Sequence, residues 1–165
     1  RLYAPESLPI AKLYLGKGKA LLARGDEVNA TADIVRALAI YKNVVGPDSL
    51  LLEEPLLLAV RVDKREVREE SLRHLLSLRE KHDGVESGKA LDAAEQLADF
   101  LVKERRYAEA HPIYLRLIKA WQPLLPTQFS AYGDRYRRLV DVLITDETTA
   151  TRLLQEKIPD RLATA

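Results

Sequence analysis

The stretch RGDEVNATADIVRALAIYKNVVGPD, residues 24–48, decides the fold class. Near its start stand Gly25, a residue type that commonly follows the end of a helix, and Asp26, whose side chain can cap the next helix. Apolar residues then recur at mostly helical spacing, including Val28, Ile34, Leu38 and Tyr41. The stretch closes on Gly46-Pro47-Asp48, a strong turn signal. It therefore predicts one complete α-helix between two turns.

Outward from this helix, three- and four-residue spacing of apolar residues continues along nearly the whole chain. No segment shows the strict alternation that is typical of a half-buried strand. Most Gly and Pro residues fall between the periodic segments, and Pro55 is expected in a first turn or at a kink. The sequence therefore predicts an all-α fold with helices over residues 9–24, 26–46, 49–62, 63–82, 87–104, 107–121, 127–144 and 145–157.

Length and composition limit the function classes. The 165 residues suit one domain or one short array of repeats. Lys and Arg number 26 and Asp and Glu 25, so the net charge of +1 gives no strong field for nucleic acid or anionic lipid. The absence of cysteine excludes disulfides, thiolate zinc sites and Fe–S clusters, and it fits both the cytoplasm and the periplasm. Without methionine, even at residue 1, the chain is expected to be a processed or excised piece of a longer product. No apolar run approaches the length of a membrane helix.

Helix pairs recur with a period of about forty residues. The corners inside successive pairs, at Gly25, Asp63, Arg105 and Thr145, are 38, 42 and 40 residues apart. An apolar residue follows each corner nine positions later, at Ile34, Leu72, Tyr114 and Leu154. Small residues stand five positions after three corners, at Ala30, Ala110 and Ala150, and seven before two, at Gly18 and Ala98. Small side chains there would let two helices approach closely. Leu56, Arg68 and Arg138, in the corresponding places, mark the second and fourth units as degenerate.

The order Gly25-Asp26, Ala30, Arg36-Ala37-Leu38, Ile40 and Gly46-Pro47-Asp48 resembles the tetratricopeptide repeat, in the form found in kinesin light chain and many bacterial proteins. The third unit is similar, through Leu97-Ala98, Leu101, Arg106-Tyr107, Glu109-Ala110, Pro112, Tyr114 and Arg116. Departures are Lys17 and Leu117 at packing positions, and Asp63, Arg105 and Thr145 in place of the corner glycine.

This resemblance implies a single domain over residues 1–165, folded as a right-handed α-solenoid of about four antiparallel hairpins. The units would cover about 10–48, 49–84, 87–123 and 127–158. The alternative is an unrelated helical bundle whose hairpins happen to be regular.

Residue types that carry chemistry form no recognisable constellation. His74, His82 and His111 lack the i, i+4 spacing of a helical metal site, and no phosphate-binding glycine loop occurs. Rows of carboxylates on helices are most often solvated or ligand-binding faces. We therefore predict no enzyme activity, no metal, no cofactor and no small-molecule substrate. RNA binding at Arg135-Tyr136-Arg137-Arg138 or at residues 103–106 is a less favoured alternative.

The resemblance further implies a concave face lined by the first helix of each hairpin, where a protein or peptide segment would bind. Asn29 and Asn43, the two asparagines, belong to second helices, which disfavours recognition of a chaperone tail. The alternatives are self-association around Trp121, Leu124, Leu125 and Phe129, and a regulatory sensor segment of a larger protein. The candidate groove residues are Lys12, Leu15, Lys19, Leu22, Leu50, Glu53, Leu57, Arg61, Asp92, Glu95, Asp99, Lys103, Tyr132, Arg135, Leu139 and Val142.

Overall fold

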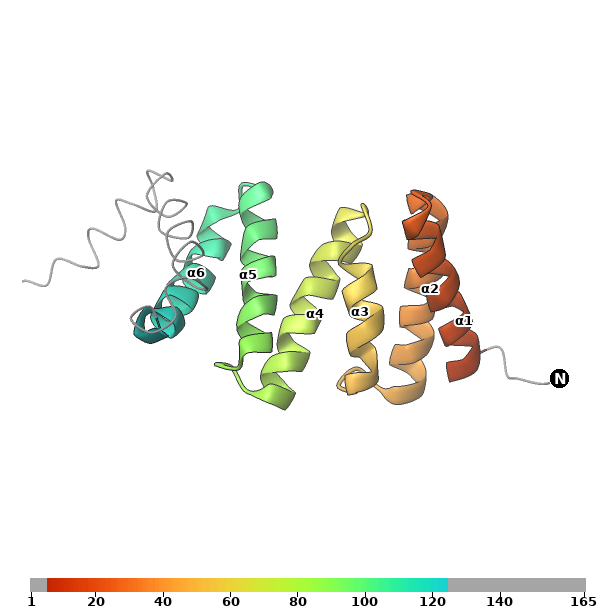
Figure 1. Ribbon diagram of the computed structural model, residues 1–165, viewed down its shortest axis with the longest axis horizontal. Coiled ribbons are helices and arrows are strands. Elements are labelled where there is room, and N and C mark those ends of the chain that lie inside the picture. Colours follow the sequence, from red (N-terminus) through yellow and green to blue (C-terminus); the bar gives the residue numbers. More distant parts are fainter. Residues whose placement is uncertain (1–5, 125–165) are drawn as a thin grey trace, which may run out of the picture. The chain divides into compact units, whose positions relative to one another are not determined.

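A computed structural model describes residues 6–124 of the chain. This part is all-α, which confirms the predicted fold class (Figure 1). The two helices predicted over 127–144 and 145–157 lie outside the described residues. The helices are α1 (Leu8–Ala23), α2 (Glu27–Val45), α3 (Glu53–Ala59), α4 (Arg65–Asp83), α5 (Gly88–Lys103) and α6 (Tyr107–Trp121), with short 3-10 turns η1 (Leu50–Leu52) and η2 (Gln122–Leu124).

The helix ends follow local capping chemistry. The Asp26 side chain accepts a hydrogen bond from the backbone N–H of Asn29 at 3.3 Å and so caps α2 as predicted. The segment expected as one helix over 49–62 is divided into η1 and α3. Pro55 sits in the first turn of α3, where its missing N–H costs no intrahelical hydrogen bond.

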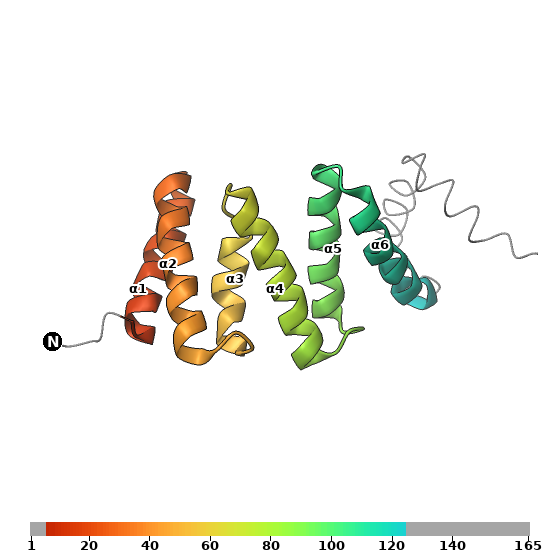
Figure 2. The ribbon, with the colours of Figure 1, turned by 180° about the vertical axis from the view of Figure 1, so that it is seen from behind.

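Two compact units divide the chain, residues 1–93 and 94–165, and α5 crosses the boundary. In the first unit, helices α1 to α4 follow one another side by side in sequence order, as both views show (Figures 1 and 2). Its core is built from buried residues of α1, α2, η1, α3 and α4, among them Ala11, Ile34, Leu52, Leu56 and Leu75. Leu56 therefore occupies the core although it replaces the small residue expected at its position.

Close helix approach is confirmed at Gly18 on α1. A Cβ added there would lie 2.6 Å from Cγ1 of Ile34 and 3.3 Å from the carbonyl oxygen of Ala30, both on α2. Contacts below 3.0 Å are not tolerated, and Ile34 is a fully buried, β-branched residue with little rotamer freedom. Glycine at this position is therefore what lets α1 lie directly against α2.

The backbone repeats one hydrogen-bonding pattern at two corners that lie 80 residues apart. Gly25 has φ 77°, and the N–H groups of Gly25 and Asp26 donate to the carbonyls of Leu22 and Leu21. At the second corner Arg105 has φ 57°, and the N–H groups of Arg105 and Arg106 donate to the carbonyls of Val102 and Leu101. Arg105 therefore takes the left-handed conformation that glycine supplies in the first unit.

The connections between hairpins also recur. Gly46 and Gly84 both have positive φ, and their carbonyls accept hydrogen bonds from the N–H groups of Ser49 and Ser87. Each serine hydroxyl then accepts a backbone N–H at the start of the next helical segment, from Leu51 and from Ala90. The two links thus use the same three-residue step from glycine to a serine cap.

The corner between α3 and α4 departs from this pattern. Asp63 does not have positive φ, and α3 is only seven residues long. Arg68, which replaces a small residue of the motif, donates from Nε and Nη2 to the carbonyl of Val62 at 3.1 and 2.7 Å. A side-chain guanidinium therefore satisfies a carbonyl just after α3, whereas the corners at Gly25 and Arg105 are closed by the N–H groups of the corner residue and the one after it.

Replacing Arg105 by glycine should stabilise the protein. A left-handed conformation costs an L-residue about 1–2 kcal/mol, and glycine would remove this cost. Part of the gain in stability is lost again, because glycine also gives the unfolded chain more conformational freedom. We expect the free energy of unfolding, measured by urea denaturation, to rise by about 0.5–1 kcal/mol. Arg24→Gly is the matched control, because Arg24 has φ −92° and no strain to relieve, so it should show no gain. An equal change in the free energy of unfolding for both variants would contradict the view that the backbone of Arg105 is strained.

Candidate functional site

On α1, two of the predicted groove lysines are available to a partner. Lys12 and Lys19 are exposed and form no ion pair with any described residue. Lys17, by contrast, contacts Asp33 of α2 at 2.9 Å, and hydrogen bonding to Asp33 raises the pKa of Lys17. Leu15 is only 4% exposed and belongs to the core. Thus α1 presents two unpaired cations, and Leu15 does not reach the surface.

The short segment η1–α3 presents apolar side chains to solvent. Leu50 and Leu51 are more than half exposed, and Leu57 is 37% exposed. Arg61, just after α3, is exposed and makes no ion pair among the described residues. Single exposed leucines are ordinary, but three within eight residues, followed by an exposed arginine without an ion pair, are candidates for contact with a partner.

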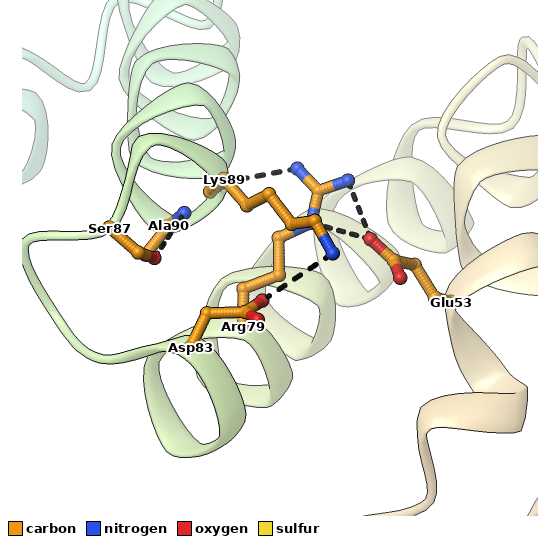
Figure 3. A network of polar contacts seen from close by, with 6 residues as sticks. All are labelled: Glu53, Arg79, Asp83, Ser87, Lys89 and Ala90. Carbon is orange, nitrogen blue, oxygen red and sulfur yellow. Dashed lines mark hydrogen bonds and ion pairs between the residues drawn. The ribbon is translucent and has the colours of Figure 1, made fainter.

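Glu53, also predicted for the groove, forms an ion pair with another helix of the fold (Figure 3). Arg79 of α4 donates from Nε and Nη2 to Oε1 of Glu53 at 3.0 and 2.9 Å. The third nitrogen of the guanidinium, Nη1, donates to the carbonyl of Lys89 at 3.1 Å, and Nζ of Lys89 lies 3.9 Å from Asp83. One largely buried arginine thus links α3, α4 and the first turn of α5.

The predicted acidic residues of α5 are similarly engaged. Glu95 is 6% exposed, and Asp92 is half-buried. Asp99 accepts a hydrogen bond from the hydroxyl of Tyr114 on α6 at 3.0 Å. Lys103 is exposed. Tyr132 and Arg135, with Leu139 and Val142, lie outside the described residues. The acidic groove candidates Glu53, Glu95 and Asp99 are therefore buried or bonded within the fold, whereas Lys12, Lys19, Leu50, Leu57 and Arg61 are exposed.

The histidines of α4 hold the loop between α2 and α3. Nε2 of His74 lies 2.7 Å from the carbonyl oxygen of Pro47, and Nε2 of His82 lies 2.7 Å from that of Asp48. A carbonyl only accepts, so both rings donate from Nε2. Lys81 pairs with the Asp48 carboxylate, and this hydrogen bond lowers the pKa of Asp48. These contacts fix the loop between α2 and α3 against α4.

Two further aromatic residues singled out from the sequence are buried in the second unit. His111 is 6% exposed and Trp121 2% exposed, both on α6. Trp121 was one motive for expecting self-association, and its burial makes it unavailable as an exposed contact. Leu125 and Phe129 lie outside the described residues, and the side chain of Leu124 is likewise not described.

Sequence reasoning missed a hollow of about 510 Å³ between α2 and the corner that joins α3 to α4. Val28 was named with Ile34, Leu38 and Tyr41 as one set of apolar residues, but Val28 is 82% exposed whereas the other three are buried. Val28, Ala32 and Val35 recur at helical spacing as a second apolar stripe, and this spacing could have revealed the hollow. Together with Val28, Ala32 and Val35, the lining includes Glu27, Asp63 and Lys64.

Neither metal-site nor membrane geometry is found in the part of the chain that is described. Residues 6–124 contain no group of three His, Cys, Asp or Glu side chains that could hold a metal ion. None of helices α1 to α6 has the length and apolar character needed to cross a membrane. No family model matches the chain, and no curated protein matches it either.

Proposed function

We propose that the chain is a non-catalytic scaffold of tetratricopeptide-like hairpins, stacked as a right-handed α-solenoid, which binds a segment of another protein. The repeated corners at Gly25 and Arg105 and the repeated links at Gly46 and Gly84 support this architecture. Their backbone hydrogen bonds recur in the same register as the sequence motif. Stacked repeats of this kind provide an extended binding surface without a catalytic centre.

The observation that carries the proposal is the open basic and apolar surface on α1 and on η1–α3. In a tetratricopeptide array these are first helices of neighbouring hairpins, which line the concave face. Lys12, Lys19 and Arg61 are exposed without ion pairs, and Leu50 and Leu57 are exposed apolar side chains. Two carboxylates predicted for the same face, those of Glu53 and Asp99, are bonded to Arg79 and Tyr114 instead. The surface therefore suits an acidic segment with aliphatic side chains.

A preformed helical surface lowers the cost of binding. Helices α1 and α3 are already packed against α2 through the core, so little ordering is needed on this side. The partner segment alone would lose conformational freedom. We therefore expect an affinity in the micromolar range, about −8 kcal/mol.

The proposal predicts charge-dependent binding of a leucine–glutamate peptide. We would measure fluorescence anisotropy of a labelled peptide that alternates leucine and glutamate, and of its leucine–lysine counterpart, with the full chain. Lys19→Glu should weaken binding of the glutamate peptide about tenfold, because an attraction becomes a repulsion. Lys119→Glu, an exposed lysine on α6, makes the same change in net charge and serves as the control.

The control variant should bind the glutamate peptide like the unaltered protein. If both variants weaken binding equally, net charge and not the α1 surface governs the interaction. If the unaltered protein binds neither peptide, the proposed surface is wrong.

A further inference from the structure

The hollow beside α2 is lined by none of the residues assigned to the proposed peptide-binding face. Helix α2 packs its core stripe inward through Ala30, Ile34 and Ala37, all fully buried. Its second stripe, Val28, Ala32 and Val35, is exposed and lines the hollow. A helix of a globular protein usually presents polar residues on its outer side, so this stripe requires a separate explanation.

The apolar part of the lining comes from Val28, Ala32 and Val35, and the one hydroxyl among the lining residues is already bonded. Thr31 also lines the hollow, but its Oγ1 donates to the carbonyl of Glu27 at 2.7 Å, one turn earlier. The hydroxyl is therefore already satisfied as a donor. The volume of about 510 Å³ falls within the range of about 300–1,000 Å³ that is usual for ligand pockets. The hollow is thus large enough for the side chains of a short helical segment.

Charged residues of the lining give the hollow an acidic bias. The Glu27 carboxylate forms no ion pair with any described residue. Asp63 has only a long contact, 3.9 Å, with Nη2 of Arg68, and its side chain is 82% exposed. Lys64 is the cation in the lining. Two carboxylates against one ammonium favour a ligand that carries positive charge beside an apolar group.

We propose that this hollow is a second docking site, which takes an amphipathic helical segment of another protein with aliphatic anchors and flanking Lys or Arg residues. The anchors lie on the stripe formed by Val28, Ala32 and Val35. A basic side chain of the segment pairs with Glu27 or Asp63. This is helix-in-groove recognition, with apolar side chains supplying affinity and the carboxylates selecting the sign of charge. The scaffold thereby joins two segments of opposite charge through two different sets of residues.

The test compares two substitutions of exposed alanines on the same helix. A labelled amphipathic peptide with leucines at i and i+4 and flanking lysines is titrated into the full chain, and anisotropy is recorded. Ala32→Arg fills the hollow and should weaken binding at least about tenfold. Ala39→Arg adds the same group two turns further along, outside the lining, and should leave binding unchanged. Glu27→Gln should weaken binding about threefold, and the peptide with glutamates in place of lysines should bind more weakly.

Each other outcome overturns the proposal. Absence of saturable binding of the lysine peptide removes the docking site. Equal effects of the two arginine substitutions place the peptide elsewhere on the chain. Preference for the glutamate peptide reverses the assigned chemistry. If light scattering shows a dimer that Ala32→Arg dissociates, the occupant is a second copy of this chain. Lys19→Glu should not affect this peptide, which separates the failure of this site from the failure of the proposed function.

Discussion

Gly18→Leu should lower the free energy of unfolding by about 3 kcal/mol. Leucine would place its Cβ 2.6 Å from Cγ1 of Ile34, and the rest of its side chain has no space between α1 and α2. Ile34 cannot turn away, because it is fully buried and β-branched. Overpacking of this kind typically costs 1–3 kcal/mol or more, which exceeds the gain of about 1 kcal/mol in helix propensity. Urea denaturation followed by far-ultraviolet circular dichroism would measure the loss.

The neighbouring glycine offers a control with the opposite expected sign. Gly16 lies on the same helix, is exposed, and has no atom within 4 Å of an added Cβ. Gly16→Leu therefore has only the gain in helix propensity and should stabilise the protein by about 0.5–1 kcal/mol. A loss of similar size in both variants would mean that the contact between α1 and α2 at Gly18 is not tight. The difference between the two variants isolates packing from propensity.

Helix positions could be predicted from the sequence because their ends are fixed locally. Gly25, Gly46 and Gly84 all adopt positive φ, which glycine accepts without strain. The capping role of Asp26 likewise depends on residues within one turn. The predicted range of α6, residues 107–121, agrees with the structure at both ends. Such interactions are readable because donor and acceptor lie a few positions apart.

The faces of the helices were harder to predict because apolar residues occur on more than one side. Val28 lies six residues before Ile34, which at 3.6 residues per turn separates the two side chains by about 120° around the helix axis. A list of apolar residues does not separate Val28 from the buried ones, whereas its angular position indicates the outer side. The hollow was missed for this reason. A count of angular positions along α2, as well as of apolar residues, would have separated the two stripes.

The acidic groove residues were unpredictable for a different reason, since their partners are distant in sequence. Glu53 pairs with Arg79, 26 positions later, and Asp99 accepts from Tyr114, 15 positions later. Nothing in the local pattern distinguishes these carboxylates from solvated ones such as Glu54. Helix packing alone decides which carboxylates meet a donor. Lys12 and Lys19 remain candidate binding residues because packing brings no carboxylate to them.

Glu53→Ala is the second substitution for which we expect a large effect. It removes the acceptor of two hydrogen bonds from Arg79 and leaves a guanidinium that is only 11% exposed without its counter-charge. Breaking a buried ion pair on one side costs about 3–5 kcal/mol, and the partial exposure of Glu53 reduces this to about 2–3 kcal/mol. We expect that loss in the free energy of unfolding, measured by urea denaturation.

Glu54→Ala provides the matched control, because Glu54 lies in the same first turn of α3 but is exposed and unpaired among the described residues. Both variants lose the same favourable interaction of a carboxylate with the helix N-terminus, so their difference reports the Arg79 contact alone. Combining Glu53→Leu with Arg79→Met should restore most of the stability, since a buried ion pair can be replaced by apolar side chains at little cost. Equal losses for Glu53→Ala and Glu54→Ala, or no recovery in the double variant, would show that Arg79 does not link α3 to α4.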